Sequence, residues 1–159
     1  MFFKLDNIID WEKPYNIRSA YIDGFMTELG FVLIGRGRMR AVYRAPNKRY
    51  VLKFPHHEAG LKGNIEEARR YSKYKNNPDP TNHGAVYAPC RLIQGSILIM
   101  WSIVSTFGDS SGCHQATKNK LLETADEDNQ PDWVSHLDCN QAGYLRNGRI
   151  VAYDFTETY

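Results

Sequence analysis

The stretch that most constrains the fold runs from Leu33 to Lys53, LIGRGRMRAVYRAPNKRYVLK. It contains three runs rich in β-branched, aromatic and other apolar residues, and glycine-containing or polar turns separate them. Gly35 and Gly37 lie in the first turn, where glycine lets the backbone bend sharply and present its N–H groups. The stretch therefore predicts three strands and a turn whose N–H groups face a phosphate-containing ligand.

A single lysine ends the third of these runs. Lys53 lies in Val-Leu-Lys-Phe, so apolar side chains flank the charge on both sides. Burying an unpaired ammonium group is costly, and an inward-pointing Lys53 therefore needs an anionic partner. Glu67 lies in the next expected helix, beside its apolar stripe, and the intervening sequence is long enough for a loop and one helical turn. We therefore expect a pair between Lys53 and Glu67.

Apolar residues at helical spacing mark two helices. The first is expected over residues 15–29, and Gly30 after it is a helix-stop signal. The second is expected from a cap at Asn64 to about Lys75, with acids in its first turn that favour the positive end of the helix dipole. The buried face of the first helix is expected to consist of Ile17, Ala20, Tyr21, Phe25, Met26 and Leu29.

Two hairpins are expected further along the chain. Gln94-Gly95 separates the apolar runs 85–93 and 96–104, and Asn147-Gly148 separates two short runs near the end of the sequence. The first hairpin completes a five-stranded antiparallel sheet. The fold class is therefore expected to be α+β.

Composition limits the remaining possibilities. The 159 residues provide one compact unit with two unequal lobes, and the net charge of +2 gives no general attraction to nucleic acid or membrane. Three cysteines without a C-x-x-C spacing argue against a disulfide framework or a structural zinc site. The sequence has no signal-peptide core and no long apolar run, so we expect a cytoplasmic protein.

The pattern Gly35-x-Gly37-x-x-Arg40-x-Val42, followed by a strand that ends at Lys53, resembles the nucleotide-binding lobe of protein kinases. The resemblance implies an ATP site formed by these five residues. The two glycines would cover the phosphates and Lys53 would contact them. Arg40 stands where the third glycine of the loop is expected, and it would add a phosphate contact.

A second motif resembles the catalytic loop of protein kinases. His136-x-Asp138 is similar to the part of that loop that contains the catalytic aspartate. The resemblance implies that Asp138 orients the acceptor hydroxyl and that Lys53 and Glu67 complete the catalytic set.

Asp154, followed by phenylalanine, resembles the metal-binding Asp-Phe-Gly site, and the resemblance implies that Asp154 holds Mg²⁺. The asparagine expected five residues after Asp138 is replaced by Gly143. Asn140 and Gln141 are the two side chains that could take its place as a metal ligand, although their places in the loop differ, and we assign the role to Asn140.

Within the kinases, the chain is most similar to the small kinase-like proteins of bacteriophages. The resemblance rests on Gly30-Phe31, Gly35-x-Gly37, Ala41-x-Tyr43, Val-Leu-Lys53 and Glu67-Ala68-x-x-Tyr71. It implies a protein kinase-like fold with a five-stranded N-lobe sheet and helix C over residues 1–102, and a truncated C-lobe over residues 103–159. It also implies Mg-ATP as cofactor and phosphotransfer to a serine or threonine of a host protein, in the host cytoplasm.

Two alternatives remain open. The missing asparagine and the short C-lobe also fit a pseudokinase, which would act as a viral inhibitor by binding a host enzyme or defence complex. A basic hairpin also fits a phosphate-rich partner such as nucleic acid, but we favour an ATP-facing or solvated hairpin. Its cations are Arg36, Arg38, Arg40, Arg44, Lys48 and Arg49. In both main readings the expected partner is a host protein, and no membrane contact is expected.

Overall fold

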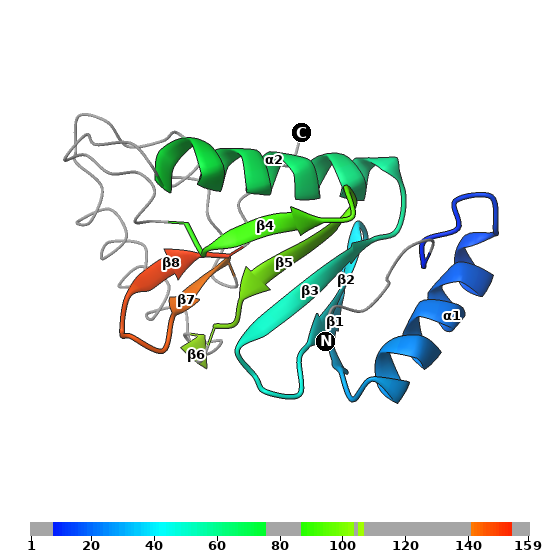
Figure 1. Cartoon of the computed structure of the whole chain (residues 1–159), viewed down its shortest axis with the longest axis horizontal. Coiled ribbons are helices and arrows are strands. Elements are labelled where there is room, and N and C mark those ends of the chain that lie inside the picture. Colours follow the sequence, from blue (N-terminus) through cyan, green and yellow to red (C-terminus); the bar gives the residue numbers. More distant parts are fainter. Residues whose placement is uncertain (1–7, 76–86, 104, 107–140, 154–159) are drawn as a thin grey trace. The chain divides into compact units, whose positions relative to one another are not determined.

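The computed structural model describes residues 8–75, 87–103, 105–106 and 141–153, which form an α+β fold with two helices and two sheets (Figure 1). The chain divides into two compact units, residues 1–65 with 92–99 and residues 66–91 with 100–159. The elements are α1 (Tyr15–Glu28), β1 (Val32–Arg36), β2 (Arg40–Arg44), β3 (Tyr50–Pro55), α2 (Glu58–Lys75), β4 (Cys90–Ile93), β5 (Ile97–Trp101), β6 (Ser105–Thr106), β7 (Ala142–Tyr144) and β8 (Ile150–Ala152).

The larger sheet has the strand order β1-β2-β3-β5-β4, which confirms the expected five-stranded antiparallel sheet. In the β2–β3 pair Val42 lies opposite Lys53, and Ala41 lies opposite Phe54. Successive side chains of a strand point to opposite faces. Val42 and Lys53 therefore share one face of the sheet, and Ala41 and Phe54 share the other.

The core of the first unit lies on the Ala41–Phe54 face, where α1 contributes Ile22 and Met26. Tyr43 and Phe54 pack there edge to face, with ring centroids 5.4 Å apart. This arrangement leaves the face with Val42 and Lys53 free of α1.

Helix α1 is confirmed, and its expected buried face is right in part. Met26 is buried, and Phe25 and Leu29 are partly buried against the core, but Ile17, Ala20 and Tyr21 are exposed. Arg18, Ile22 and Met26 point inward, whereas Ile17 and Tyr21 are 53% and 59% exposed. Arg18 takes an inward position because its guanidinium donates hydrogen bonds to the carbonyl oxygens of Lys13 and His56. A polar side chain with buried partners thus displaces the apolar stripe read from the sequence.

The second helix also differs from its prediction, because α2 begins at Glu58 and includes Asn64 in its interior. The Asn64 side chain bonds to groups of the sheet, so it does not cap a helix. The helix extends to Lys75, as expected.

Both predicted hairpin turns are present. Gln94 and Gly95 have φ values of 51° and 68°, as a two-residue turn of type I′ requires, and they join β4 to β5. Gly148 has a φ of 79° in the turn between β7 and β8. The β7–β8 hairpin belongs to a three-stranded sheet in the second unit, with the order β6-β7-β8.

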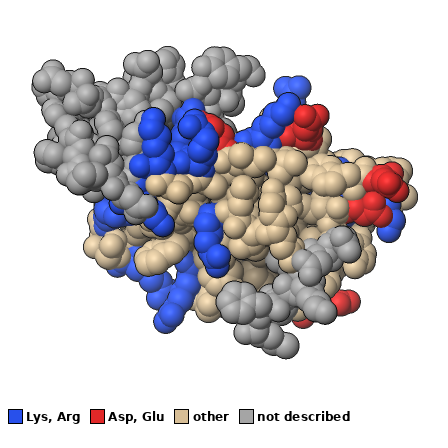
Figure 2. All heavy atoms as spheres, turned by 45° about the horizontal axis from the view of Figure 1, so that its top comes forward, with Lys and Arg blue, Asp and Glu red and all other residues tan. Residues whose placement is uncertain are grey.

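Charged side chains of both signs are interspersed on the face seen in Figure 2, in keeping with the net charge of +2. Neither α1 nor any other helix in the described ranges is long and apolar enough to cross a bilayer.

One glycine fixes the start of α2. A Cβ added at Gly60 would lie 2.2 Å from the Met39 carbonyl oxygen and 3.2 Å from Pro55 Cβ, whereas a Cβ at Gly24 would meet nothing within 4 Å. We expect Gly60→Ala to lower the free energy of unfolding by about 2 kcal/mol or more, because the backbones must separate. Gly24→Ala, in α1, is the matched control and should raise it by about 0.5–1 kcal/mol. Urea denaturation measures both, and equal effects of the two substitutions would contradict this packing.

Candidate functional site

The candidate site lies on the face of β2 and β3 that points away from α1. Val42 and Lys53 lie directly opposite each other there, and Gly35 of β1 pairs with Val42 on the other side. Arg40, opposite Pro55, is on the same face. The structure thus brings together Gly35, Arg40, Val42 and Lys53, four of the five residues expected at an ATP site.

Two cations of this face are buried. Lys53 is 4% exposed and Arg40 is 8% exposed. Both have polar or electrostatic partners within the protein, and one partner of Arg40 is the Asn64 side chain. Buried cations require such partners, because removing a charge from water is costly.

Asn64 connects α2 to this face of the sheet. Its Nδ2 donates to the Lys53 carbonyl oxygen at 3.0 Å and to the Ser96 carbonyl oxygen at 2.8 Å. Its Oδ1 accepts from Arg40 Nη1 at 3.3 Å. The side chain is fully buried, so one amide joins the backbone of β3, the turn before β5 and the side chain of Arg40.

The sequence analysis missed this role of Asn64 and treated the residue as a helix cap. The available signal was its spacing, because Asn64, Glu67 and Tyr71 recur three and four residues apart, as one helix face does. A longer helix that began earlier would have placed Asn64 on the inward stripe.

The turn after β1 differs in part from the expectation. Neither Gly35 nor Gly37 has a positive φ, so the turn does not require glycine for its backbone conformation. The Gly37 N–H donates to the Arg40 carbonyl oxygen at 2.9 Å inside the hairpin, so it is not free for a phosphate as predicted. A Cβ on Gly35 would meet nothing within 4 Å, and one on Gly37 would meet only the Arg40 oxygen at 3.9 Å. The glycines leave open space beside the hairpin.

His56 holds the glycine turn and was not singled out from the sequence for this role. Its Nε2 lies 3.1 Å from the Gly37 carbonyl oxygen, and its backbone N–H donates to the Met39 carbonyl oxygen at 2.9 Å. A carbonyl oxygen only accepts, so Nε2 bears the proton in the bond to Gly37. Burial, aided by the charge of Arg36, lowers the pKa of His56 below its ordinary value, which favours the neutral ring.

Helix α1 holds the end of β1 through a charged cluster. The Arg36 guanidinium donates to both carboxylate oxygens of Asp23, at 2.6 and 2.8 Å, and to Ser19 Oγ at 2.5 Å. Tyr43 also donates to Asp23, and burial together with this bond raises the pKa of the Tyr43 hydroxyl. Ser19, Arg36 and Tyr43 line a small hollow between α1 and the sheet, with room for about one water molecule (about 10 Å³).

Glu67, the expected partner of Lys53, is fully buried in α2 and has a polar partner. Its own backbone oxygen accepts a hydrogen bond from Cys90 Sγ at 3.6 Å. Lys53 belongs to the first unit and Glu67 to the second, and their pairing stays a prediction.

The expected catalytic and metal-binding residues Asp138, Asn140 and Asp154 lie outside the described residues. Gly143 is described and pairs with Val151 in the β7–β8 hairpin, where it offers no side chain to a metal. The described ranges contain no group of three or more His, Cys, Asp or Glu side chains placed to hold a metal ion.

In comparisons with known proteins, the chain matches no protein-family model and no curated protein sequence. Support for a function therefore comes from the geometry of the chain itself.

The amide of Asn64 should be important for stability. Asn64→Ala removes one hydrogen-bond partner from each of the Lys53 carbonyl, the Ser96 carbonyl and the Arg40 guanidinium. Because buried polar groups then lack a partner, we expect the free energy of unfolding to fall by about 2–4 kcal/mol. The matched control is Asn47→Ala, since Asn47 Oδ1 accepts from the Arg49 N–H in an exposed turn, and its loss should cost about 1 kcal/mol or less. Denaturant titration measures both, and a loss at Asn64 no larger than at Asn47 would contradict the bridging role.

His56 should make stability depend on pH. Its pKa is lower in the folded state than in the unfolded chain, so the unfolded chain binds a proton first as pH falls below about 6.5. This contribution to stability is present in full above that pH and is lost progressively below it. In His56→Gln the amide can still donate to the Gly37 carbonyl but does not titrate. We therefore expect the Tm of this variant to fall less than the Tm of wild type when the pH is lowered from 7.5 to 5. His57→Gln, at the exposed neighbour whose charge is a smaller cause of the lowered pKa of His56, should change the profile less than His56→Gln does, and identical profiles for all three proteins would contradict the prediction.

Proposed function

We propose that the chain is a minimal kinase-like protein of the bacteriophage type, which binds Mg-ATP and transfers phosphate to a serine or threonine of a host protein. The observation that carries the proposal is the register of β2 and β3. It places Val42 and Lys53 side by side on one face, with Gly35 beside Val42. A nucleotide needs an apolar contact for its base and a cation for its phosphates, and this face offers both.

The electrostatics of the face support an anionic ligand. Arg40 and Lys53 are diagonal neighbours on adjacent antiparallel strands, a placement that brings Cβ atoms within about 8 Å. Two cations this close in a buried setting repel each other. An anion beside both, whether a carboxylate or a phosphate, lowers this energy, and the proposed site uses Glu67 and the ATP phosphates for it.

The proposed reaction assigns a role to each predicted residue. The acceptor hydroxyl oxygen forms a bond to the γ-phosphorus, the bond from that phosphorus to the bridging oxygen breaks, and ADP leaves. Asp138 orients the hydroxyl and takes its proton, while Lys53 holds the phosphates. Asp154 and Asn140 would hold Mg²⁺, which neutralises charge on the phosphates when bound.

A second candidate is a pseudokinase that binds a host enzyme or defence complex without phosphate transfer. Gly143 in β7 favours it, because that position lacks the amide expected of a metal ligand. The Gly37 N–H favours it as well, because the hairpin already uses this donor. Both features weaken phosphate transfer and leave the Val42–Lys53 face unchanged.

A thermal shift experiment tests nucleotide binding. A ligand that binds only the folded state raises Tm, and 100-fold excess over Kd adds about 2.7 kcal/mol to the free energy of unfolding. We expect Mg-ATP to raise the Tm of wild type and of Lys62→Met, an exposed lysine of α2 with 73% of its side chain accessible. Lys53→Met should lose most of the shift, measured against its own ligand-free Tm. No shift in wild type would contradict the proposal.

Transfer of radiolabelled γ-phosphate distinguishes the two candidates. An enzyme should label itself or a protein in host lysate, and Asp138→Asn should abolish the label while it keeps the Tm shift. A Tm shift with no label in wild type under the same conditions supports the pseudokinase.

A further inference from the structure

Strand β1 lies at the edge of the five-stranded sheet and pairs with β2 on one side. Among the described residues, no strand pairs with its other side. All five of its residues are exposed, and Val32, Leu33 and Ile34 are 54%, 42% and 48% exposed. An edge of this kind offers unpaired backbone N–H and C=O groups to another chain.

Native proteins usually protect such an edge with lysine, proline or inward-pointing charges. The first three residues of β1 are apolar and include none of these. The bulge between Leu33 and Gly35 bends the strand, but it leaves the apolar side chains accessible. The edge therefore combines free backbone groups with an exposed apolar strip.

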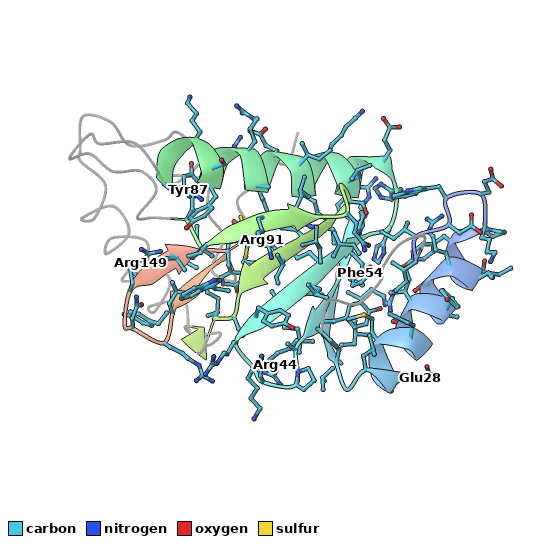
Figure 3. All side chains as sticks on the ribbon, viewed as in Figure 1. Glu28, Arg44, Phe54, Tyr87, Arg91 and Arg149 are labelled. Atoms are coloured by element: carbon cyan, nitrogen blue, oxygen red, sulfur yellow. The ribbon has the colours of Figure 1, made fainter. Side chains whose placement is uncertain are left out.

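Basic side chains lie at both ends of this strip. Arg44 is the register partner of Val32, and Figure 3 labels it near the start of β1. Lys48 and Arg49 follow in the turn after β2, while Arg38 follows the other end of β1. In the described part of the chain, no acidic side chain pairs with any of these four cations.

Arg36 and Arg40 of the same hairpin do not contribute to this exposed charge. Asp23 neutralises Arg36, and Arg40 is buried and bonds to Asn64. Among the described residues of this hairpin, the uncompensated positive charge thus lies at the two ends of the strip.

We infer that the free edge of β1 is a docking site for an extended segment of a partner protein, apolar in its middle and acidic at both ends. The segment adds to the sheet as a further strand, with backbone hydrogen bonds along the five residues of β1, about 17 Å. Its acids meet Arg44, Lys48 and Arg49 at one end and Arg38 at the other. A second copy of this chain fits the edge less well, because two such edges would bring like charges together.

A labelled peptide tests this site on the full chain. The probe has nine residues, with valine and threonine alternating in its middle and two acidic residues at each end, and the control peptide has lysines in place of the acids. Fluorescence anisotropy should show saturable binding of the acidic probe and at least about tenfold weaker binding of the control, a difference of about 1.4 kcal/mol. Equal binding of the two peptides, or no binding of the acidic probe, overturns the inference.

Variants locate the site on β1. Ile34→Glu places a negative charge in the strip and should weaken probe binding at least about tenfold. Ile65→Glu, at a residue of similar exposure on α2, is the matched control and should change the affinity less than about twofold. Circular dichroism checks that both variants are folded. Equal loss in the two variants, or self-association of wild type that Ile34→Glu removes, overturns the inference. None of these outcomes depends on ATP binding.

Discussion

The candidate site depends on one buried amide. Asn64 donates to the carbonyl oxygens of Lys53 and Ser96 and accepts from Arg40, so it fixes the backbone at the lysine and the side chain of a second cation together. Burying an amide is favourable only when its partners are in place. The contact therefore links the position of α2 to the position of Lys53, and any shift of the helix start is transmitted to the cationic face.

The glycine turn is held from the opposite side of the sheet. His56 binds the carbonyl of Gly37, and α1 holds Arg36 through Asp23. The turn is thus held by protein contacts on its inner side. This arrangement fits a preformed site, because ordering a loop upon binding would reduce the affinity.

Strands and turns were predictable because their signals are local. Gln94-Gly95 adopts the positive φ values that such a dipeptide favours, and the three strands expected in the stretch from Leu33 to Lys53 are present. The start of α2 and the inward face of α1 were harder to predict, although the spacing of Asn64, Glu67 and Tyr71 was a signal for a longer second helix. Arg18 and Asn64 are polar residues that face inward because their hydrogen-bond partners come from distant strands and loops. The spacing of apolar residues along a helix carries no information about such partners. Asp138, Asn140 and Asp154, inferred from the resemblance, stay predictions because they lie outside the described residues.

Within the first unit, the sheet has two faces and an edge that differ in burial and in charge. Its Ala41–Phe54 face is covered by α1, and its Val42–Lys53 face holds the buried cations. Its β1 edge is apolar and pairs with no further strand among the described residues. A partner on the edge would not compete with a nucleotide for any of the same side chains. Because Gly35 belongs both to β1 and to the pair with Val42, however, a docked strand would restrain the backbone beside the proposed nucleotide. If both proposed ligands bind, their binding would be coupled through this strand. Such coupling would suit an enzyme that acts on a docked protein, and equally a pseudokinase whose affinity for its target changes when ATP binds.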